Sequence, residues 1–251
     1  MSARLQDRTA LVTGSTDGIG AAIARALAAE GAYVIVSGRD TARGEKVVAA
    51  ISERGGRASF VRADLAAGLP AIGELADAAH RLAGGPLDIL VNNAAMLITP
   101  GPTADVGEDL IDQALTVNVK AAFLLTGLLA PAMAARGSGA IINLGSISGL
   151  FGTSGSALYS TTKAAIHSLT KSWAGEYGPA GVRVNTVAPG PTFTDKIAAM
   201  RDHLAPMIAA LPSRRPSTPE EVAAAVVFLA CDDASNIHGA TLSVDGGRAA
   251  V

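Results

Sequence analysis

Short apolar runs alternate with stretches of helical periodicity along the whole chain. Between the runs, apolar positions recur every three or four residues, as at Ile19, Ile23 and Leu27. Near-continuous apolar runs separated by helices predict a parallel sheet that is covered on both faces. The expected strands are residues 9–13, 33–37, 58–61, 88–92, 140–144, 182–188 and 241–244.

The length of 251 residues suits one large α/β domain, residues 1–251, better than two small ones. Gly and Pro clusters at residues 84–86, 100–102 and 137–139 separate elements, and no shift in composition marks a linker. We therefore expect a single Rossmann-type domain, with a doubly wound parallel sheet of seven strands in a three-layer sandwich.

Composition and charge narrow the class of protein. The chain is 49% hydrophobic and has a net charge of −2, with no basic cluster larger than the pair at 214–215. No nucleic-acid partner is therefore expected. The first residues lack the apolar segment of a secretory signal. The longest apolar stretch, residues 121–135, is interrupted by Thr126, Gly127 and Pro131 and is too short to cross a bilayer, so no membrane partner is expected.

Cysteine and histidine usage adds two expectations. The single Cys231 lies in an apolar helical run, where it is expected to be buried, and it cannot form an internal disulfide. A cytoplasmic protein is therefore expected. The four His residues have no ligand spacing, so no metal site is expected. These residues are His80, His167, His203 and His238.

A glycine-rich turn follows the first expected strand. Residues 13–20 read Thr-Gly-Ser-Thr-Asp-Gly-Ile-Gly and run straight into the first expected helix. Glycines let the backbone approach a ligand closely, and the N–H groups at a helix N-terminus attract a pyrophosphate. An ordinary tight turn has a similar composition, but at the first strand–helix junction the pattern indicates dinucleotide binding. The expected contacts come from Gly14, Ser15, Thr16, Asp17, Gly18 and Ile19.

Tyr159 and Lys163 lie four residues apart in an expected helix, so their side chains rise from one face. A positive charge ~4 Å from a phenol favours the phenolate by about 4 kcal/mol at an effective dielectric of ~20. Lys163 is therefore expected to lower the pKa of Tyr159 and make it a general acid and base. Ser146 ends the fifth expected strand, where open α/β sheets place ligands. The Tyr–Lys spacing alone occurs often by chance, so its weight depends on the other motifs.

Taken in order, these motifs resemble the short-chain dehydrogenase/reductase family over essentially the whole chain. The outline is similar to that of its 3-oxoacyl-(acyl-carrier-protein) reductases, and Ala95 replaces the glycine that ends the family's N-N-A-G motif. The resemblance rests on Thr13, Gly14, Gly18 and Gly20 of T-G-x-x-x-G-x-G, on Asn92, Asn93 and Ala94, on Asn118 and Ser146, on Tyr159 and Lys163 of Y-x-x-x-K, and on Pro189 and Gly190.

The resemblance implies a role for each matched residue. The catalytic set would be Asn118, Ser146, Tyr159 and Lys163, with Asn118 holding a water that relays protons to Lys163, and Lys163 gripping the nicotinamide ribose. Two simpler roles stay open: an Asn92 amide that ties neighbouring strands, and an Asp64 that caps a helix. The further cofactor contacts implied are Gly38, Arg39, Asp64, Leu65, Asn92, Ala94, Tyr159, Lys163, Pro189, Gly190 and Thr192.

The end of the second expected strand bears on the choice of cofactor. A carboxylate there would bind the ribose 2′-hydroxyl of NAD, whereas an Arg accepts the 2′-phosphate of NADP. Gly38 stands where NAD-preferring members hold Asp, and Arg39 follows, so NADP(H) is favoured over NAD(H). Asp17 in the glycine turn and Asp40 beside Arg39 favour the opposite choice.

The expected activity is NAD(P)(H)-dependent interconversion of a carbonyl and a secondary alcohol. Tyr159 would supply the proton to the carbonyl oxygen, and Ser146 would hydrogen-bond that oxygen. Two alternatives stay open: a cofactor-binding regulator or scaffold without turnover, which the intact Ser, Tyr and Lys disfavour, and a dehydratase or epimerase on the same fold.

The partner is expected to be a small-molecule carbonyl or alcohol, and nothing in the sequence separates an acyl-carrier ketone, a sugar, a steroid or a small ketone. Residues 191–216 are expected to form a lid over it, with Met96, Leu97 and Ile98 as a second apolar wall. The resemblance also implies a homotetramer or homodimer. The apolar residues of the expected lid, which fit a packed helix face equally well, are Phe193, Ile197, Met200, Leu204, Met207 and Leu211.

Overall fold

One parallel sheet of seven strands forms the centre of the protein. The computed structural model describes residues 3–194 and 201–251, without the side chains of residues 201–204. The strand order is β3-β2-β1-β4-β5-β6-β7, and every neighbouring pair is parallel. The expected doubly wound α/β sheet is confirmed. The strands are β1 (Thr9–Val12), β2 (Tyr33–Gly38), β3 (Arg57–Arg62), β4 (Ile89–Asn92), β5 (Gly139–Leu144), β6 (Val182–Pro189) and β7 (Thr241–Val244).

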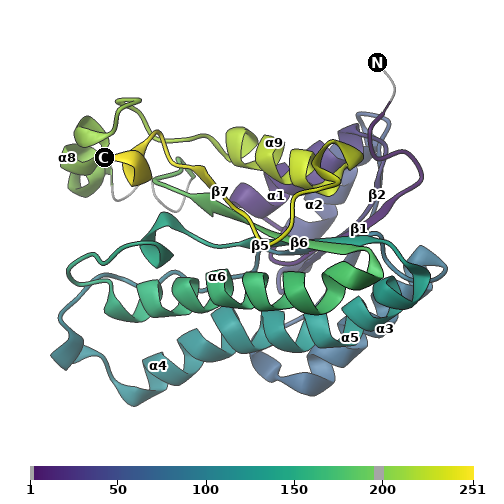
Figure 1. Cartoon of the computed structure of the whole chain (residues 1–251), viewed down its shortest axis with the longest axis horizontal. Coiled ribbons are helices and arrows are strands. Elements are labelled where there is room, and N and C mark those ends of the chain that lie inside the picture. The colour runs from purple at the N-terminus through teal and green to yellow at the C-terminus, as the bar shows by residue number, and fades with distance from the viewer. Residues whose placement is uncertain (1–2, 195–200) are drawn as a thin grey trace.

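Helices cover both faces of this sheet (Figure 1). On one face lie α1 (Gly18–Ala29), α2 (Thr41–Ser52) and α9 (Pro219–Ala230); on the other lie α3 (Leu69–Ala83), α4 (Glu108–Leu115), α5 (Ala121–Arg136) and α6 (Ala157–Tyr177). Helix α8 (Arg201–Ala210) lies near the C-terminus in the same view. Short helices are η1 (Leu65–Ala67), η2 (Thr103–Asp105), η3 (Thr116–Lys120), η4 (Ile147–Gly149), η5 (Gly178–Ala180), η6 (Asp232–Ala234) and η7 (Arg248–Ala250).

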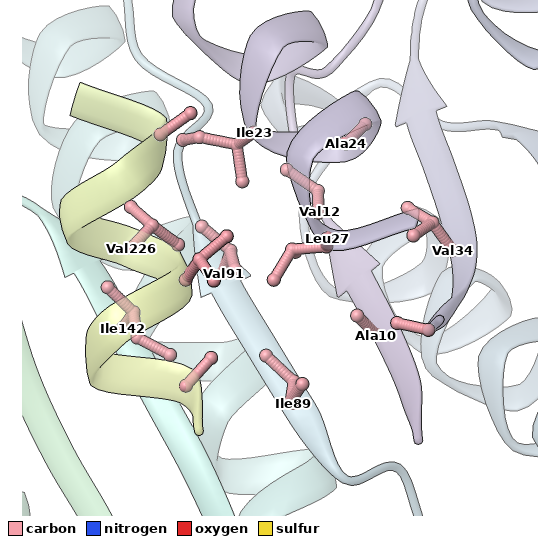
Figure 2. Packing of buried hydrophobic residues seen from close by; sticks show 14 of the residues in the cluster. Ala10, Val12, Ile23, Ala24, Leu27, Val34, Ile89, Val91, Ile142 and Val226 are labelled. Carbon is pink, nitrogen blue, oxygen red and sulfur yellow. The ribbon is translucent and has the colours of Figure 1, made fainter. Parts of the chain in front are cut away.

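Alternate strand residues fill two separate cores. Val12 faces the helices α1 and α9, where it packs with Leu27 and Val226 in the core shown in Figure 2. The next residue back, Leu11, faces the opposite core with Leu125 of α5. Because both side-chain directions of a strand are buried, the strands read as continuous apolar runs. This is why their positions could be predicted to within one or two residues.

The helical segment α4–η3–α5 is longer than the sequence analysis expected. It runs without a break over Glu108–Arg136, 29 residues, and is long and apolar enough by length and composition to cross a membrane. The helix is thus longer than the apolar stretch 121–135 from which the expectation was drawn. Its residues Leu125, Leu129 and Met133 are buried in the core beneath the sheet, as in the core helix of a globular domain. Within it, η3 is a π-helical turn that contains the buried Asn118.

The capping residues of α9 have the expected role. Thr218 accepts a hydrogen bond from the Glu221 backbone N–H at 3.2 Å, and the Glu221 carboxylate accepts one from the Thr218 N–H at 2.8 Å. Arg215 pairs with the same carboxylate at 2.6 Å, and these bonds lower the pKa of Glu221 to about 2. Cys231 follows as the C-cap and is buried, as expected.

Candidate active site

The glycine turn at the end of β1 brings backbone close to backbone. Gly14 and Gly18 have φ of 62° and 51°, a left-handed conformation that favours glycine. A Cβ on Gly14 would lie 2.7 Å from the Cα of Ala94, and one on Gly20 would lie 2.3 Å from the Gly14 carbonyl oxygen. Side chains at these positions would close the turn against the end of β4. The glycines are therefore needed for the shape of this loop.

The first turn of α1 is left available for an anion. Asp17 is the N-cap residue, but its side chain makes no capping hydrogen bond. Its carboxylate instead pairs with Arg43 at 3.2 Å. The first residues of α1 line the cleft, and their backbone N–H groups have no side-chain acceptor from the helix's own cap, an arrangement that suits phosphate.

A cleft of ≈ 1030 Å³ extends from this turn to Tyr159. Its volume is at the upper end of the range for small-molecule sites. The volume, the turn without Cβ atoms and the uncapped helix fit a dinucleotide. Of the expected cofactor residues, the cleft is lined by Gly14, Thr16, Asp17, Gly18, Ile19, Gly38, Arg39, Asp64, Leu65, Ala94 and Tyr159; further lining residues include Arg43, Asn93, Met96, Leu97, Gln113, Val117 and Thr194.

Two expected cofactor residues turn their side chains away from the cleft. The Ser15 hydroxyl donates to the Val12 carbonyl at 2.6 Å and accepts from the Ser37 N–H at 3.0 Å, so it ties the ends of β1 and β2. The buried Asn92 amide donates to Asn143 at 2.9 Å and to a threonine of α5. The Asn92 side chain therefore ties neighbouring strands, the simpler role considered for it, and its expected cofactor contact stays a prediction.

The neighbouring Asn93, matched to the same motif but not among the expected cofactor contacts, lines the cleft instead. Its amide donates to the carbonyls of Thr13 and Gly14 at 2.9 and 3.0 Å, which holds the glycine turn against β4. The position of Asn93 could have indicated this, because it lies one residue beyond the end of β4, where side chains no longer follow the alternation of a strand.

The end of β2 carries an ionic network that the sequence did not reveal. Arg43 lies 3.2 Å from Asp17 and 3.2 Å from Asp40, and its own N–H donates to Asp40 at the start of α2. Arg39 is exposed at the cleft and, among the residues described, makes no ion pair. Asp40 thus pairs with Arg43 and not with Arg39 as expected. A Cβ on Gly38 would lie 2.7 Å from the Thr16 methyl group, so glycine is favoured there.

Asp64 has the capping role considered for it, and its cofactor contact stays a prediction. Its carboxylate accepts from the Ala66 N–H at 3.1 Å and so caps η1, and Asp64 and Leu65 also line the cleft.

Tyr159 lines the far end of the cleft, whereas Ser146, its buried neighbour, is absent from the cleft lining. Ser146 follows β5 as expected and caps η4, where its hydroxyl oxygen accepts from the Ser148 N–H at 3.1 Å. Burial raises the pKa of Tyr159, and a hydrogen bond with Ser146 opposes that rise. Since the Ser148 N–H occupies an acceptor position on the Ser146 oxygen, the Ser146 O–H remains as a donor toward Tyr159 or an incoming oxygen.

Lys163 does not bring the pKa of Tyr159 below its ordinary value, since burial raises that pKa, which corrects the expectation. Its ammonium is buried, donates to the Leu144 carbonyl at 2.8 Å, and lies 5.7 Å from the centre of the Tyr159 ring. Burial lowers the pKa of Lys163 to about 8. Burial also raises the pKa of Tyr159, and this effect is larger than the lowering caused by Ser146. Lys163 remains a positive charge one helical turn below the phenol at neutral pH.

The Asn118 side chain makes hydrogen bonds to the Met96 backbone and to α6. Its Oδ1 accepts from the Met96 N–H at 2.6 Å, and its Nδ2 donates to the Met96 carbonyl at 3.1 Å and to the Thr162 hydroxyl at 3.2 Å. Thr162 in turn donates to the Tyr159 carbonyl at 2.8 Å. Asn118 thus joins the loop after β4 to α6, and its water-relay role stays a prediction.

His167 is the neighbour of Ser146 that the sequence analysis missed. The imidazole is buried, and its Nε2 lies 3.0 Å from the Ser146 carbonyl oxygen. The available signal was spacing, because His167 follows Lys163 by four residues just as Lys163 follows Tyr159.

The loop after β6 closes against the C-terminal segment. The Gly190 N–H donates to the Val244 carbonyl at 3.0 Å, and a Cβ on Gly190 would lie 2.7 Å from Asp245. Thr192 is buried and donates to the Gly190 carbonyl at 3.0 Å. Pro189, Gly190 and Thr192 are absent from the cleft lining, whereas Thr194 lines it. Of the expected lid residues, Leu211 is buried and Phe193 is exposed; Ile197, Met200 and the side chain of Leu204 lie outside the described residues.

No side chains suited to a metal gather near this cleft: within the described part of the chain, no group of three His, Cys, Asp or Glu could hold an ion. The polar groups at Tyr159 can pass a proton to or from a substrate oxygen. They cannot supply electrons, which the dinucleotide carries in a redox reaction.

Comparison with known proteins shows which family has this arrangement. The enoyl-(acyl carrier protein) reductase family model matches residues 14–249. The chain is 40% identical to cis-4-hydroxycyclohexanecarboxylate dehydrogenase of Sinomonas cyclohexanicum, covering 100% of both chains. It is 35% identical to cyclopentanol dehydrogenase of Comamonas sp., covering 98% of this chain and 99% of that one.

A solved structure agrees with these relatives. The 3-oxoacyl (acyl-carrier-protein) reductase of Agrobacterium tumefaciens with NADP bound is 35% identical and has a TM-score of 0.92, covering 98% of this chain and 95% of that one. The chain therefore belongs to the short-chain dehydrogenase/reductase family, and it is an oxidoreductase that acts on CH–OH groups with a nicotinamide cofactor.

Proposed function

We propose that Tyr159 and Ser146 perform the proton chemistry of an NADP(H)-preferring oxidoreductase that interconverts a ketone and a secondary alcohol. The observation that carries this proposal is one cleft with the glycine turn at one end and Tyr159, which has Ser146 beside it, at the other. The cofactor, when bound, supplies or accepts the hydride. The side chains of this protein transfer the proton and hydrogen-bond the substrate oxygen.

Ser146 and Tyr159 divide the work on the substrate oxygen. The Ser146 hydroxyl donates a hydrogen bond to that oxygen as negative charge develops on it. Tyr159 gives its proton to the same oxygen during reduction and takes it back during oxidation. The raised pKa of Tyr159 keeps the phenol protonated at neutral pH, which suits reduction.

The residues that would hold the cofactor fall into three groups. Gly14, Thr16, Gly18 and Ile19 offer backbone to the pyrophosphate, and Asp64, Leu65 and Ala94 line the adenosine side. Lys163 and Tyr159 lie at the nicotinamide side. The backbone of Pro189, Gly190 and Thr192 would contact the cofactor at the same end.

The preference for NADP(H) rests on two arginines. Arg39 is exposed at the cleft, and Arg43 stands beside it on the first turn of α2. A planar guanidinium binds a phosphate in a bidentate manner, and Gly38 provides no carboxylate to repel it. The Agrobacterium tumefaciens reductase, whose structure holds NADP, supports this preference.

Apolar walls favour a small cyclic or aliphatic substrate. Met96 and Leu97 line the cleft, and Leu97 and Phe193 are largely exposed. Two relatives are named for alicyclic alcohols, so alicyclic ketones are the first substrates to try. The lid role of residues 191–216 stays a prediction, since residues 195–200 lie outside the described part.

We also propose a homotetramer, or a homodimer, in the cytoplasm. Ile111, Leu115, Phe123 and Leu128 leave apolar surface exposed along α4 and α5, which suits contact with a second copy. We infer the cytoplasm because Cys231 is the single cysteine of the sequence and is free, whereas disulfides are typical of oxidising compartments.

The experiment that tests the proposed function is the substitution Tyr159→Phe. The variant is expected to bind NADPH with an unchanged Kd and to reduce an alicyclic ketone at least about a thousandfold more slowly, because no proton donor remains. Retained turnover would overturn the assignment. Product analysis on the wild type separates reduction from dehydration or epimerisation.

A further inference from the structure

Side chains from three successive turns of α6 contact the residues at the end of β5. The Ser146 side chain lies close enough to the Tyr159 phenol to oppose the rise in its pKa, Lys163 donates to the Leu144 carbonyl at 2.8 Å, and His167 lies 3.0 Å from the Ser146 carbonyl. Residues at four-residue intervals lie on one helix face, so this row is continuous. The proposed function uses the first two members of the row and leaves the third without a role.

The imidazole of His167 sits in a space shaped for it. The residue is 6% exposed. A Cβ on Gly145 would lie 2.6 Å from its Nε2, and a Cβ on Gly149 would lie 2.8 Å from its Cδ2. Both glycines flank Ser146 in the chain, so the ring packs directly against the backbone that carries the Ser146 hydroxyl.

The distances indicate which nitrogen carries the proton. Nε2 lies 3.0 Å from the Ser146 carbonyl oxygen and 3.4 Å from the Ser146 nitrogen, and Nδ1 lies 3.2 Å from the Thr241 hydroxyl. With the proton on Nε2, the ring donates to the closer carbonyl, and the Thr241 O–H donates to Nδ1. Burial, with the nearby positive charges of Lys163 and Lys171, lowers the pKa of His167, while the Ser146 carbonyl raises it.

We propose that His167 is a positioning residue that fixes Ser146 by donating from Nε2 to the Ser146 carbonyl, with Thr241 holding the far side of the ring. This inference rests on the proposed function, because the position that His167 fixes is that of the hydroxyl facing the substrate oxygen. Loss of this bond lets the Ser146 backbone move. An error of about 1 Å in such a group reduces turnover by about a hundredfold.

Two amide substitutions separate the two ring contacts. The amide nitrogen of Gln extends about as far as imidazole Nε2, and that of Asn about as far as Nδ1. His167→Gln therefore keeps the bond to Ser146, whereas His167→Asn keeps only the contact with Thr241. The first is expected to retain kcat within about threefold, and the second to lose about 10- to 100-fold in kcat with the KM for NADPH unchanged.

The outcomes are distinguishable even if one variant fails to fold. Equal kcat in the two folded variants, or a loss confined to the KM for NADPH, would overturn the proposal. If only His167→Gln folds, near wild-type kcat supports it and a loss greater than about tenfold overturns it. His80 provides the control, since its buried Nε2 has no hydrogen-bond partner among the described residues, and His80→Asn is expected to leave kcat unchanged.

A second readout needs neither substrate nor cofactor. Because the hydrogen bond from Ser146 lowers the pKa of Tyr159, displacing Ser146 should raise that pKa further. Ultraviolet titration of the three tyrosines, with Tyr159→Phe as the reference, should give a higher Tyr159 pKa in His167→Asn than in His167→Gln. Identical curves would overturn the proposal. A wild type that fails to reduce ketones would overturn the proposed function and leave this titration intact as a test.

Discussion

The two ends of the cleft present different chemistry. The end at β1 and β2 offers backbone N–H groups, glycines and exposed charges, among them Arg39 and Arg43. The end at Tyr159 is backed by buried polar side chains that already have partners, namely Ser146, Lys163 and His167. Binding a phosphate needs only available donors, whereas stabilising charge that develops during a reaction needs groups held in place beforehand.

This difference predicts a division in the effects of mutation. Changes at the β1–β2 end should alter the KM and the choice of cofactor and leave the chemical step alone. Changes at the β5–α6 end should reduce kcat, since buried groups there act only when they are correctly placed.

Among side-chain changes that leave Tyr159 intact, the largest effect is expected for Ser146→Ala. Loss of the donor to the substrate oxygen should reduce kcat by about a hundredfold to a thousandfold, with the Kd for NADPH unchanged. Ser148→Ala is the matched control, because Ser148 contributes its backbone N–H to this site and keeps that group as Ala. Comparable losses in the two variants would contradict the division.

Lys163→Met should separate activity from stability. The variant is expected to lose about a hundredfold in kcat, since the positive charge near the phenol is gone. Its free energy of unfolding should rise by about 2 kcal/mol near pH 7, because burying a protonated Lys163 with a pKa of about 8 costs about 3 kcal/mol and the lost bond to Leu144 returns about 1 kcal/mol.

The sign of the pH dependence follows from the same pKa. Between about pH 8 and the higher pKa of the unfolded chain, the unfolded state binds more protons, so the stability of the wild type rises with pH. Urea unfolding at several pH values should show the gain in Lys163→Met shrinking across that window. A gain that stays constant with pH would contradict the buried-charge explanation.

At the other end, Arg39→Ala should reduce kcat/KM with NADPH by about tenfold and leave kcat/KM with NADH nearly unchanged. Arg43→Ala should have a smaller effect, because its guanidinium is shared with Asp17 and Asp40. Steady-state kinetics with both cofactors checks this. A wild type that prefers NADH, or equal losses with the two cofactors, would refute the preference.

The smallest effect is expected far from both ends. Thr218→Ala removes the cap of α9 and should lower the free energy of unfolding by about 1 kcal/mol, measured by thermal or urea unfolding. Its kcat should equal that of the wild type. A reduced kcat would mean that α9 influences the cleft.

The order of elements could be predicted from the sequence because each β strand is buried on both faces. Leu11 and Val12 point to opposite cores, and a continuous apolar run of this kind is stable only in a strand that is buried on both faces. The glycine turn and Ser146 at the end of β5 were predictable for a related reason, since their backbone positions follow directly from the strand ends.

The direction of polar side chains could not be predicted in this way. Asn92 and Asn93 are adjacent and chemically identical, yet the first is buried between strands and the second lines the cleft. Arg43 pairs with Asp17 across two loops, and Lys163 bonds to a carbonyl of β5. These choices depend on which atoms tertiary packing brings within reach, and sequence spacing does not encode that distance.

The most direct test of the account follows the hydride in the wild-type enzyme. An alicyclic ketone is incubated with NADPH that carries deuterium at the transferred position of the nicotinamide, and the product is examined by mass spectrometry and NMR. The account predicts one deuterium on the carbinol carbon of a secondary alcohol. A product without deuterium at that carbon, or an epimerised or dehydrated product, would contradict it.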